Sequence, residues 1–149
     1  MLTKRAKYAL RALLYLADRQ ADGPVLIARL ANDELIPKKF LERILLDLNK
    51  HGFLQSRKGK GGGYSLAKGP DHIMIGDVIR LMDGPLAPVS CVSKTAYARC
   101  QDCRAEATCA IRPLMKEVRD AIALIVDNTT LATMMANATN DSVGWTYEI

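Results

Sequence analysis

The sequence gathers its cysteines in one short segment, and thiolates are well suited to bind soft metals or to undergo redox chemistry. The four thiols are Cys91, Cys100, Cys103 and Cys109, in the pattern C-x(8)-C-x(2)-C-x(5)-C. Three basic residues are interleaved with them, namely Lys94, Arg99 and Arg104. Because a positive environment favours the thiolate over the thiol, this segment predicts a metal or redox site.

Four thiols so close together could also form disulfides or pack as inert side chains. Disulfide frameworks belong mostly to small secreted domains. The N-terminus does not resemble a secretory signal, because basic residues between Lys4 and Arg11 interrupt it and no run of roughly 7 to 15 apolar residues follows. We therefore expect a cytoplasmic, reducing compartment, in which metal or cluster ligation is favoured over thiol redox chemistry and inert packing.

The spacing alone leaves three kinds of site open. Four thiolates could complete a 2Fe-2S or 4Fe-4S cluster without another ligand. They could instead close a tetrahedral zinc site, although structural zinc motifs usually pair two short knuckles and only Cys100-Gln101-Asp102-Cys103 has that spacing. The same C-x-x-C pair could act as a dithiol switch.

Length and charge limit the class of protein. A chain of 149 residues with 49% hydrophobic content can bury one core. No stretch approaches 18 consecutive apolar residues, so we expect no transmembrane helix and no membrane partner. Residues 1–68 carry fourteen Lys and Arg against six Asp and Glu, whereas residues 69–149 carry seven against ten. The net charges are therefore +8 and −3, and the basic half is the candidate for binding a polyanion.

The basic half begins with three predicted helices. Thr3 can cap a first helix that runs to about Arg19. A second short helix is expected over residues 25–32, and a third from Pro37 to Lys50 after a tight turn. Two short helices joined by such a turn suggest a helix-turn-helix.

A basic, glycine-rich hairpin follows the third helix. Two short strands, residues 53–57 and 64–66, flank the segment Lys58-Gly59-Lys60-Gly61-Gly62-Gly63. Glycine lets the backbone approach a surface closely, while the two lysines offer charge to phosphates. A nucleotide-binding loop is disfavoured, since Tyr64 occupies the third glycine position of the dinucleotide fingerprint and no Ser or Thr follows Lys60. A hairpin directly after a recognition helix is typical of a wing.

The acidic half contains one short and one long predicted helix around the cysteine segment. The short helix is expected over residues 76–82. The long helix is marked by five apolar residues spaced alternately four and three apart: Ile111, Met115, Val118, Ile122 and Ile125. This spacing indicates either a dimer seam or an ordinary core face, and two heptads do not separate the two. The tail from Asn128 to Ile149 has no assigned role.

With its elements in this order, the chain resembles the Rrf-two family of bacterial winged-helix regulators over about residues 1–135. The most specific segments are Lys7-Tyr8-Ala9-Leu10-Arg11-Ala12-Leu13, Phe40-Leu41-Glu42-Arg43-Ile44-Leu45 and Gly61-Gly62-Gly63-Tyr64. The resemblance implies a mainly α fold with a small β-hairpin wing: a winged helix-turn-helix domain (1–82), a cysteine-rich sensor loop (83–109), and a dimerisation helix with tail (110–149). It also implies a homodimeric transcription factor, in most members a repressor, that binds near-palindromic double-stranded DNA.

The resemblance also implies roles for individual residues. The third helix would enter the major groove, the wing would reach the minor groove, and the first helix would grip the DNA backbone. The implied contacts are Lys4, Arg5, Lys7, Arg11, Pro37, Lys38, Lys39, Glu42, Arg43, Lys58, Lys60, Gly61, Gly62, Gly63 and Tyr64. Several members hold an iron-sulfur cluster before the long helix. Cys91, Cys103 and Cys109 match their ligand positions, which leaves Cys100 as an extra thiol.

Two features depart from the family pattern. Leu35 stands in the helix-turn-helix turn where members usually have glycine, so the turn geometry is expected to differ there. No histidine follows the cysteines as a further ligand. We expect an iron-sulfur cluster that senses iron-sulfur, redox or nitric-oxide status, ahead of a thiol switch and then zinc. A thiol oxidoreductase or electron carrier is disfavoured, because the expected βαβ pattern is absent and neither accounts for the basic half.

Overall fold

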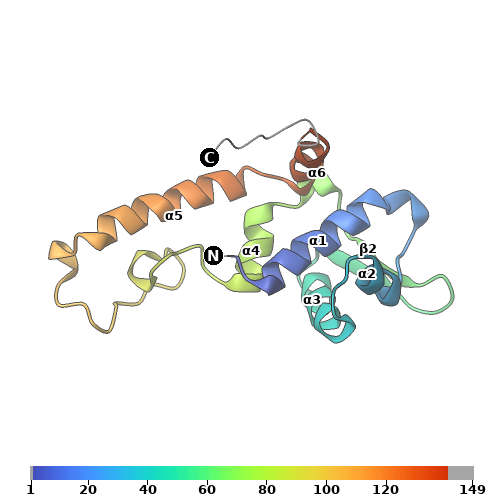
Figure 1. The fold of residues 1–149 in the computed structure, drawn as a ribbon, viewed down its shortest axis with the longest axis horizontal. Helices are drawn as coiled ribbons and strands as arrows, with labels where there is room; N and C mark the ends of the chain where they lie inside the picture. The colour runs from blue at the N-terminus through green and yellow to red at the C-terminus, as the bar shows by residue number, and fades with distance from the viewer. Residues whose placement is uncertain (1, 141–149) are drawn as a thin grey trace.

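The chain folds into a helical head, residues 2–83 and 131–140, from which one long helix extends (Figure 1). The computed structural model describes residues 2–140. The helices are α1 (Lys4–Asp18), α2 (Ile27–Asp33), α3 (Lys38–Lys50), α4 (Ile75–Asp83), α5 (Ile111–Asp127) and α6 (Leu131–Asn140). The strands β1 (Leu54–Arg57) and β2 (Gly63–Leu66) form an antiparallel hairpin. The predicted mainly α fold with a small β-hairpin wing is therefore confirmed.

Helix α1 is the packing centre of the head. Thr3 caps it as predicted, because the Thr3 Oγ1 accepts a hydrogen bond from the Ala6 amide at 3.2 Å. Ala6, Ala9 and Ala12 are fully buried. Their small side chains allow α3 and α4 to pack closely against α1.

The turn between α2 and α3 contains a residue in an unusual backbone conformation. Leu35 has a φ of 52°, in the left-handed region that favours glycine, and its side chain is 85% exposed. Arg11 of α1 holds this turn: its Nε lies 2.9 Å from Oε2 of Glu34, and its Nη2 donates to the Glu34 carbonyl. The turn thus adopts a left-handed residue without glycine, and α1 fixes it from outside.

Val25 pairs with the hairpin instead of starting α2. Its amide and carbonyl exchange two hydrogen bonds of 2.8 Å with the backbone of Tyr64. Helix α2 consequently begins at Ile27, two residues later than predicted. This bridge ties the wing to the entrance of the helix-turn-helix.

Helix α6 returns to the head and completes its core. Leu131 is fully buried, and its amide donates to the Ile73 carbonyl at 2.8 Å. The Ile75 amide donates in turn to the Thr129 carbonyl at 3.0 Å. The sequence had left this part of the tail unassigned. Residues 141–149, including Trp145 and Tyr147, lie outside the described residues.

Helix α5 extends away from the head, and the cysteine segment lies beside its far end (Figure 1). Residues 84–110 lead from α4 to α5 with short 3₁₀ turns at Ser90–Val92 and Glu106–Thr108. Pro113 falls within the first turn of α5, as predicted. The division of the chain at residues 82 and 109 stays a prediction, and α6 packs on the first of those parts.

Candidate nucleic-acid interface and cysteine site

Helix α3 presents a polar face to solvent. Its apolar side is buried in the head through Leu41, Ile44, Leu45 and Leu48. The residues predicted to contact DNA lie on the opposite side and are all exposed: Pro37, Lys38, Lys39, Glu42 and Arg43. Helix-turn-helix proteins contact DNA with an accessible, charged face near the start of the second helix of the motif, which is α3 in this chain.

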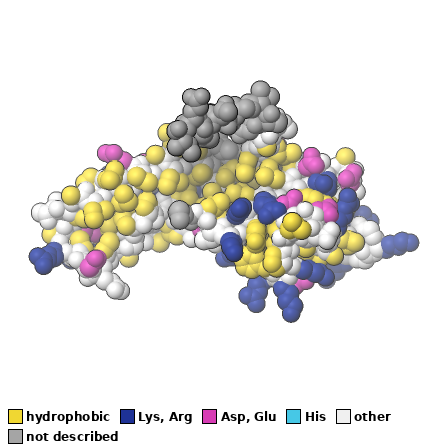
Figure 2. Space-filling model, viewed as in Figure 1, with side chains coloured by type: hydrophobic (Ala, Val, Ile, Leu, Met, Phe, Trp, Pro, Cys, Tyr) yellow, Lys and Arg dark blue, Asp and Glu magenta, His cyan; other side chains and the backbone are white. Residues whose placement is uncertain are grey.

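The tip of the hairpin is a second basic element. Lys58, Lys60 and Gly61 are exposed there. Figure 2 shows Lys and Arg side chains along the lower edge, where α3 lies, and at the protruding tip. The predicted wing therefore carries its lysines at an accessible end, where they are free to meet phosphates.

The structure explains why two positions of the wing are glycine. A Cβ on Gly62 would overlap the carbonyl oxygen of Arg57, and one on Gly63 would overlap that of Val25. Tyr64 is half-buried and bound through its backbone to Val25. These three predicted contact residues shape the hairpin, while Gly61 is exposed at its tip.

The basic residues of α1 fall into two groups. Lys4 and Lys7 are exposed. The Nη2 atom of Arg5 lies 2.6 Å from Oδ2 of Asp47, and its Nη1 donates to a carbonyl near the end of α4 at 3.2 Å. Arg5 and Arg11, both predicted to contact DNA, therefore join α1 to neighbouring elements.

All four cysteines line one cavity of about 440 Å³ beside the start of α5. Cys91 is buried, whereas Cys100, Cys103 and Cys109 are partly exposed. Burial raises the pKa of the Cys91 thiol, and a hydrogen bond with Cys100 raises it further. The structure thus brings every predicted thiol to one cavity, and Cys100, the extra one, is near enough to Cys91 to affect its pKa.

Arginine side chains hold the cysteine segment in place. The Nη2 atom of Arg99 donates to the carbonyls of Cys103 at 2.9 Å and Arg104 at 2.8 Å. Arg119 of α5 is buried, and its Nη1 donates to the Val92 carbonyl at 2.5 Å. Hydrogen bonds within the cysteine segment therefore hold its shape, and the bond from Arg119 attaches it to α5.

The donor set suits a soft metal or cluster in its chemistry, but the donors do not yet lie at ligand spacing. Thiolates are the usual ligands of iron-sulfur clusters and a common choice for zinc. Within residues 2–140, no three Cys, His, Asp or Glu side chains are grouped so that they could hold a metal ion. The thiols share a cavity, so the segment would have to contract before they could share a metal.

Arg112 is a cavity residue that the sequence did not single out. It lines the same cavity as the cysteines, and its Nε is buried with no hydrogen-bond partner among the described residues. Arg112 follows Cys109 by three residues at the start of α5. The closeness of Arg112 to Cys109 in the chain was the available signal in the sequence.

Helix α5 carries an apolar surface that the head does not cover. Figure 2 shows hydrophobic side chains along the length of this helix. Its exposed apolar residues are Ile111 (63%), Leu114 (56%), Ile122 (39%), Leu124 (69%) and Ile125 (66%). Met115 and Val118, also in the predicted seam, are half-buried. Leu114 and Leu124 were missed because they fall outside the alternating four-three spacing. No helix within residues 2–140 is long and apolar enough to cross a membrane.

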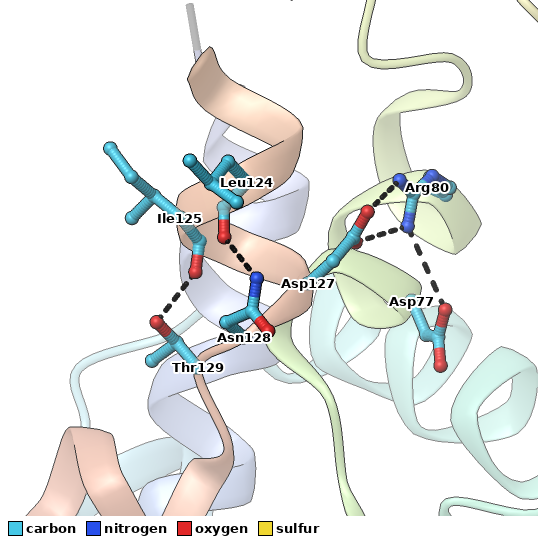
Figure 3. Close-up of polar contacts among 7 residues, drawn as sticks. All are labelled: Asp77, Arg80, Leu124, Ile125, Asp127, Asn128 and Thr129. Atoms are coloured by element: carbon cyan, nitrogen blue, oxygen red, sulfur yellow. Dashed lines mark hydrogen bonds and ion pairs between the residues drawn. The ribbon is translucent and has the colours of Figure 1, made fainter. Parts of the chain in front are cut away.

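The other end of α5 is fastened to α4 (Figure 3). The Nη1 and Nη2 atoms of Arg80 donate to the two carboxylate oxygens of Asp127 at 2.7 and 2.8 Å. The side chains of Asn128 and Thr129 donate to the carbonyls of Leu124 and Ile125, both at 2.7 Å, and so cap the last turn. Helix α5 thus connects the cysteine cavity to the head through defined polar contacts.

Comparisons with known proteins match nearly all of the chain. The family model for Rrf2, described as an iron-dependent transcriptional regulator, matches residues 2–137. An rrf2-like HTH-type transcriptional regulator of Rhodobacter capsulatus is 45% identical over 91% of this chain and 93% of that protein. The HTH-type transcriptional regulator IscR of Erwinia tasmaniensis is 31% identical over 91% of this chain and 79% of that protein.

A solved structure agrees with the fold. The structure of CymR, the global cysteine regulator of Bacillus subtilis, has a TM-score of 0.75 and 28% sequence identity, and it covers 92% of this chain and 97% of CymR. The predictions of a winged-helix transcriptional regulator rather than an enzyme are confirmed, and DNA is the partner that such relatives imply. The arrangement of helix-turn-helix, wing, cysteine segment and long helix, together with these matches, shows that the chain belongs to the Rrf2 family of transcriptional regulators.

Proposed function

We propose that this chain is a homodimeric, sequence-specific repressor that acts in the cytoplasm and senses iron-sulfur, redox or nitric-oxide status through its cysteine segment. The observation that carries the proposal is the convergence of all four cysteines on one cavity at the start of α5. The other end of the same helix is ion-paired to the head. A change in the cavity therefore has a continuous helix through which to act on the DNA-reading elements.

The winged helix-turn-helix part of the head, residues 1–82, would read the operator. Exposed Lys38, Lys39 and Arg43 favour insertion of α3 into the major groove, and Lys58 and Lys60 favour contact between the wing and phosphates near the minor groove. Two heads would read a near-palindrome with half-sites roughly 34 Å apart or a multiple of that distance.

The α5 helix of a second copy would cover the exposed apolar surface. Ile111, Ile122 and Ile125 belong to the predicted seam and are exposed in the single chain. Removing such side chains from water is favourable by roughly 25 cal/mol for each Å² of apolar surface. A pair of α5 helices would thus fix the distance between the two heads.

The cysteine segment, residues 83–109, would be the sensor. A bound 2Fe-2S or 4Fe-4S cluster would supply an oxidant-sensitive anchor for thiolates. Cys91 lies in the turn that Arg119 attaches to α5, and Cys109 directly precedes the helix. Drawing these thiols together would tighten the segment against the start of α5, and losing the anchor would release it.

A thiol switch is the second candidate, and the proximity of Cys91 and Cys100 in the cavity favours it. Oxidation by a peroxide would join the two sulfurs and transfer two electrons to the oxidant, with loss of both thiol protons. The pair differs from the C-x-x-C pair that the sequence suggested, because the fold places Cys100 against Cys91. Zinc ranks third.

Anaerobic purification and cluster reconstitution, followed by absorption spectra and iron, sulfide and zinc analysis, separate these candidates. We expect a coloured protein containing iron and sulfide. We also expect Cys103→Ala to lose the cluster and Cys100→Ala to keep it, since Cys103 matches the family ligand positions. A colourless, iron-free protein after reconstitution would retire the cluster, and a zinc-loaded protein would favour the third candidate.

A further inference from the structure

Arg112 is placed among thiols without a partner for one of its buried donors. It lies in the first turn of α5 and lines the cavity together with the four cysteines. Its Nε is buried, and no acceptor for it exists among residues 2–140. Buried N–H groups in native proteins are nearly always paired, so an orphaned one on a residue that lines a cavity points to a missing acceptor.

Neighbouring arginines, unlike Arg112, donate to identified acceptors. Arg99 donates to backbone carbonyls, and Arg119 is bound to Asp120 and to the Val92 carbonyl. No carboxylate within the described chain forms an ion pair with Arg112, whereas Arg80, Arg119 and Lys94 each have one.

Two acids, Asp102 and Glu106, line the cavity, and the second already has a hydrogen-bond partner. Glu106 lines the same cavity, but its Oε1 accepts a hydrogen bond of 2.6 Å from the Tyr97 hydroxyl. This bond raises the pKa of Tyr97, so the phenol stays a neutral donor to the carboxylate. Glu106 thus has a hydrogen-bond partner of its own, and among residues 2–140 it forms no ion pair with Arg112.

We infer that Arg112 is a positioning residue that donates its Nε–H to sulfur, and supplies a compensating positive charge, when the cysteine cavity holds an iron-sulfur cluster. This inference rests on the proposed function. A guanidinium remains protonated and has no free lone pair, so Arg112 cannot itself be a ligand. Hydrogen bonds to cluster sulfurs and the local net charge both set the reduction potential, and outer partners of this kind also stabilise the bound group.

The test uses full-length protein reconstituted anaerobically in three variants: Arg112→Met, Arg112→Lys and Arg104→Met. Arg112→Met removes both the donor and the charge, and Arg112→Lys keeps the charge without the Nε–H. Arg104→Met is the matched control, because Arg104 lines the same cavity, has an exposed side chain and carries the same charge. The readouts are the midpoint potential in a dithionite titration and the rate at which a chelator strips iron.

We expect Arg112→Met to have a more negative midpoint potential and to lose iron about 10- to 100-fold faster than the wild type. Arg112→Lys should recover part of the potential, and Arg104→Met should match the wild type. Far-ultraviolet circular dichroism of the apo proteins checks that each variant folds. If Arg112→Met does not fold, the comparison is made with Arg112→Lys, which also lacks the Nε–H donor.

A loaded Arg112 variant with the potential and iron-loss rate of the wild type overturns this inference and leaves the cluster assignment intact. Equal shifts in Arg104→Met and Arg112→Met also overturn it, because general loss of charge would then be the cause. A wild-type protein that takes up no iron and sulfide overturns the proposed cluster, and the inference with it.

Discussion

Arg80 and Asp127 join the DNA-reading head to the long helix through a two-pronged ion pair. The two guanidinium nitrogens lie 2.7 and 2.8 Å from the two carboxylate oxygens. Gly76, one turn before Arg80 on α4, makes the approach possible, because a Cβ at Gly76 would overlap Oδ1 of Asp127. The joint therefore depends on two residues of α4 and on Asp127, which follows Arg80 by 47 residues. It is the connection through which α5 would act on the head under the proposed function.

Replacing Gly76 with Ala should destabilise the protein by up to about 1 kcal/mol. An alanine in a helix interior normally stabilises by up to roughly 1 kcal/mol over glycine. Here the added methyl group would overlap Oδ1 of Asp127, so the carboxylate must move away and its ion pair with Arg80 is lost. Urea unfolding at a fixed protein concentration measures the change.

The double variant Gly76→Ala with Asp127→Ala is the control for this explanation. Once the carboxylate is gone, the Arg80 side chain, whose Nη1 would lie 2.9 Å from the added Cβ, is no longer held in place and can move aside. The alanine should then become neutral or stabilising. If Gly76→Ala remains equally harmful in the Asp127→Ala background, the clash with Asp127 is not the cause.

Acid should weaken the same joint. The hydrogen bonds from Arg80 hold the pKa of Asp127 below its ordinary value. A lowered folded-state pKa means that the contribution is complete above the unfolded pKa, about 3.9, and is lost as the pH falls through the folded pKa. We expect Asp127→Asn to lose about 1 kcal/mol at pH 7, a small value because both side chains are partly exposed. The difference between the two proteins should shrink below pH 4, and a difference independent of pH would contradict the assignment.

Lysines of α3 and the wing should determine how DNA affinity responds to salt. Each phosphate contact contributes a slope of about 0.9 in a plot of log affinity against log salt. We expect Lys39→Ala and Lys58→Ala each to reduce the slope on a mixed-sequence DNA duplex by up to about 0.9, as measured by fluorescence anisotropy.

Lys116→Ala provides the comparison for these lysines, because Lys116 is exposed on α5, away from the head. It removes the same charge and should leave the slope unchanged. If wild-type affinity does not change between low and moderate salt, the protein does not bind DNA through phosphate contacts.

A charge on the exposed face of α5 should prevent dimerisation. Ile125 is 66% exposed in the single chain, so Ile125→Asp should leave the fold of the protomer intact. A dimer formed through α5 would bury this side chain, and an unpaired carboxylate there would be strongly unfavourable. Sedimentation velocity should show a 16.4 kDa monomer for Ile125→Asp and a dimer for the wild type. Leu46→Asp, at an exposed apolar position on α3, should remain dimeric.

Local chemistry was enough to predict α1, α3, α4, α5 and the hairpin, but it did not predict α6 or the start of α2. The Thr3 cap, Pro37 before α3 and Pro113 in the first turn of α5 act within one helical turn, so the residues next to them reveal helix starts. The wing followed from its glycines and lysines for the same reason. The residues also indicated the family, because the motifs that carry the resemblance are contiguous.

The sequence by itself determined the order of helices and hairpin, the basic head and the four thiols near one another in the chain. Tertiary structure decided which of these groups are available. It engaged Arg5 with Asp47, set Cys100 against Cys91, and left Arg112 facing the cysteine cavity. Each of these outcomes depends on which groups the fold brings into contact and shields from water. Residues as far apart as Arg80 and Asp127 can therefore form one joint that no local pattern in the sequence predicts.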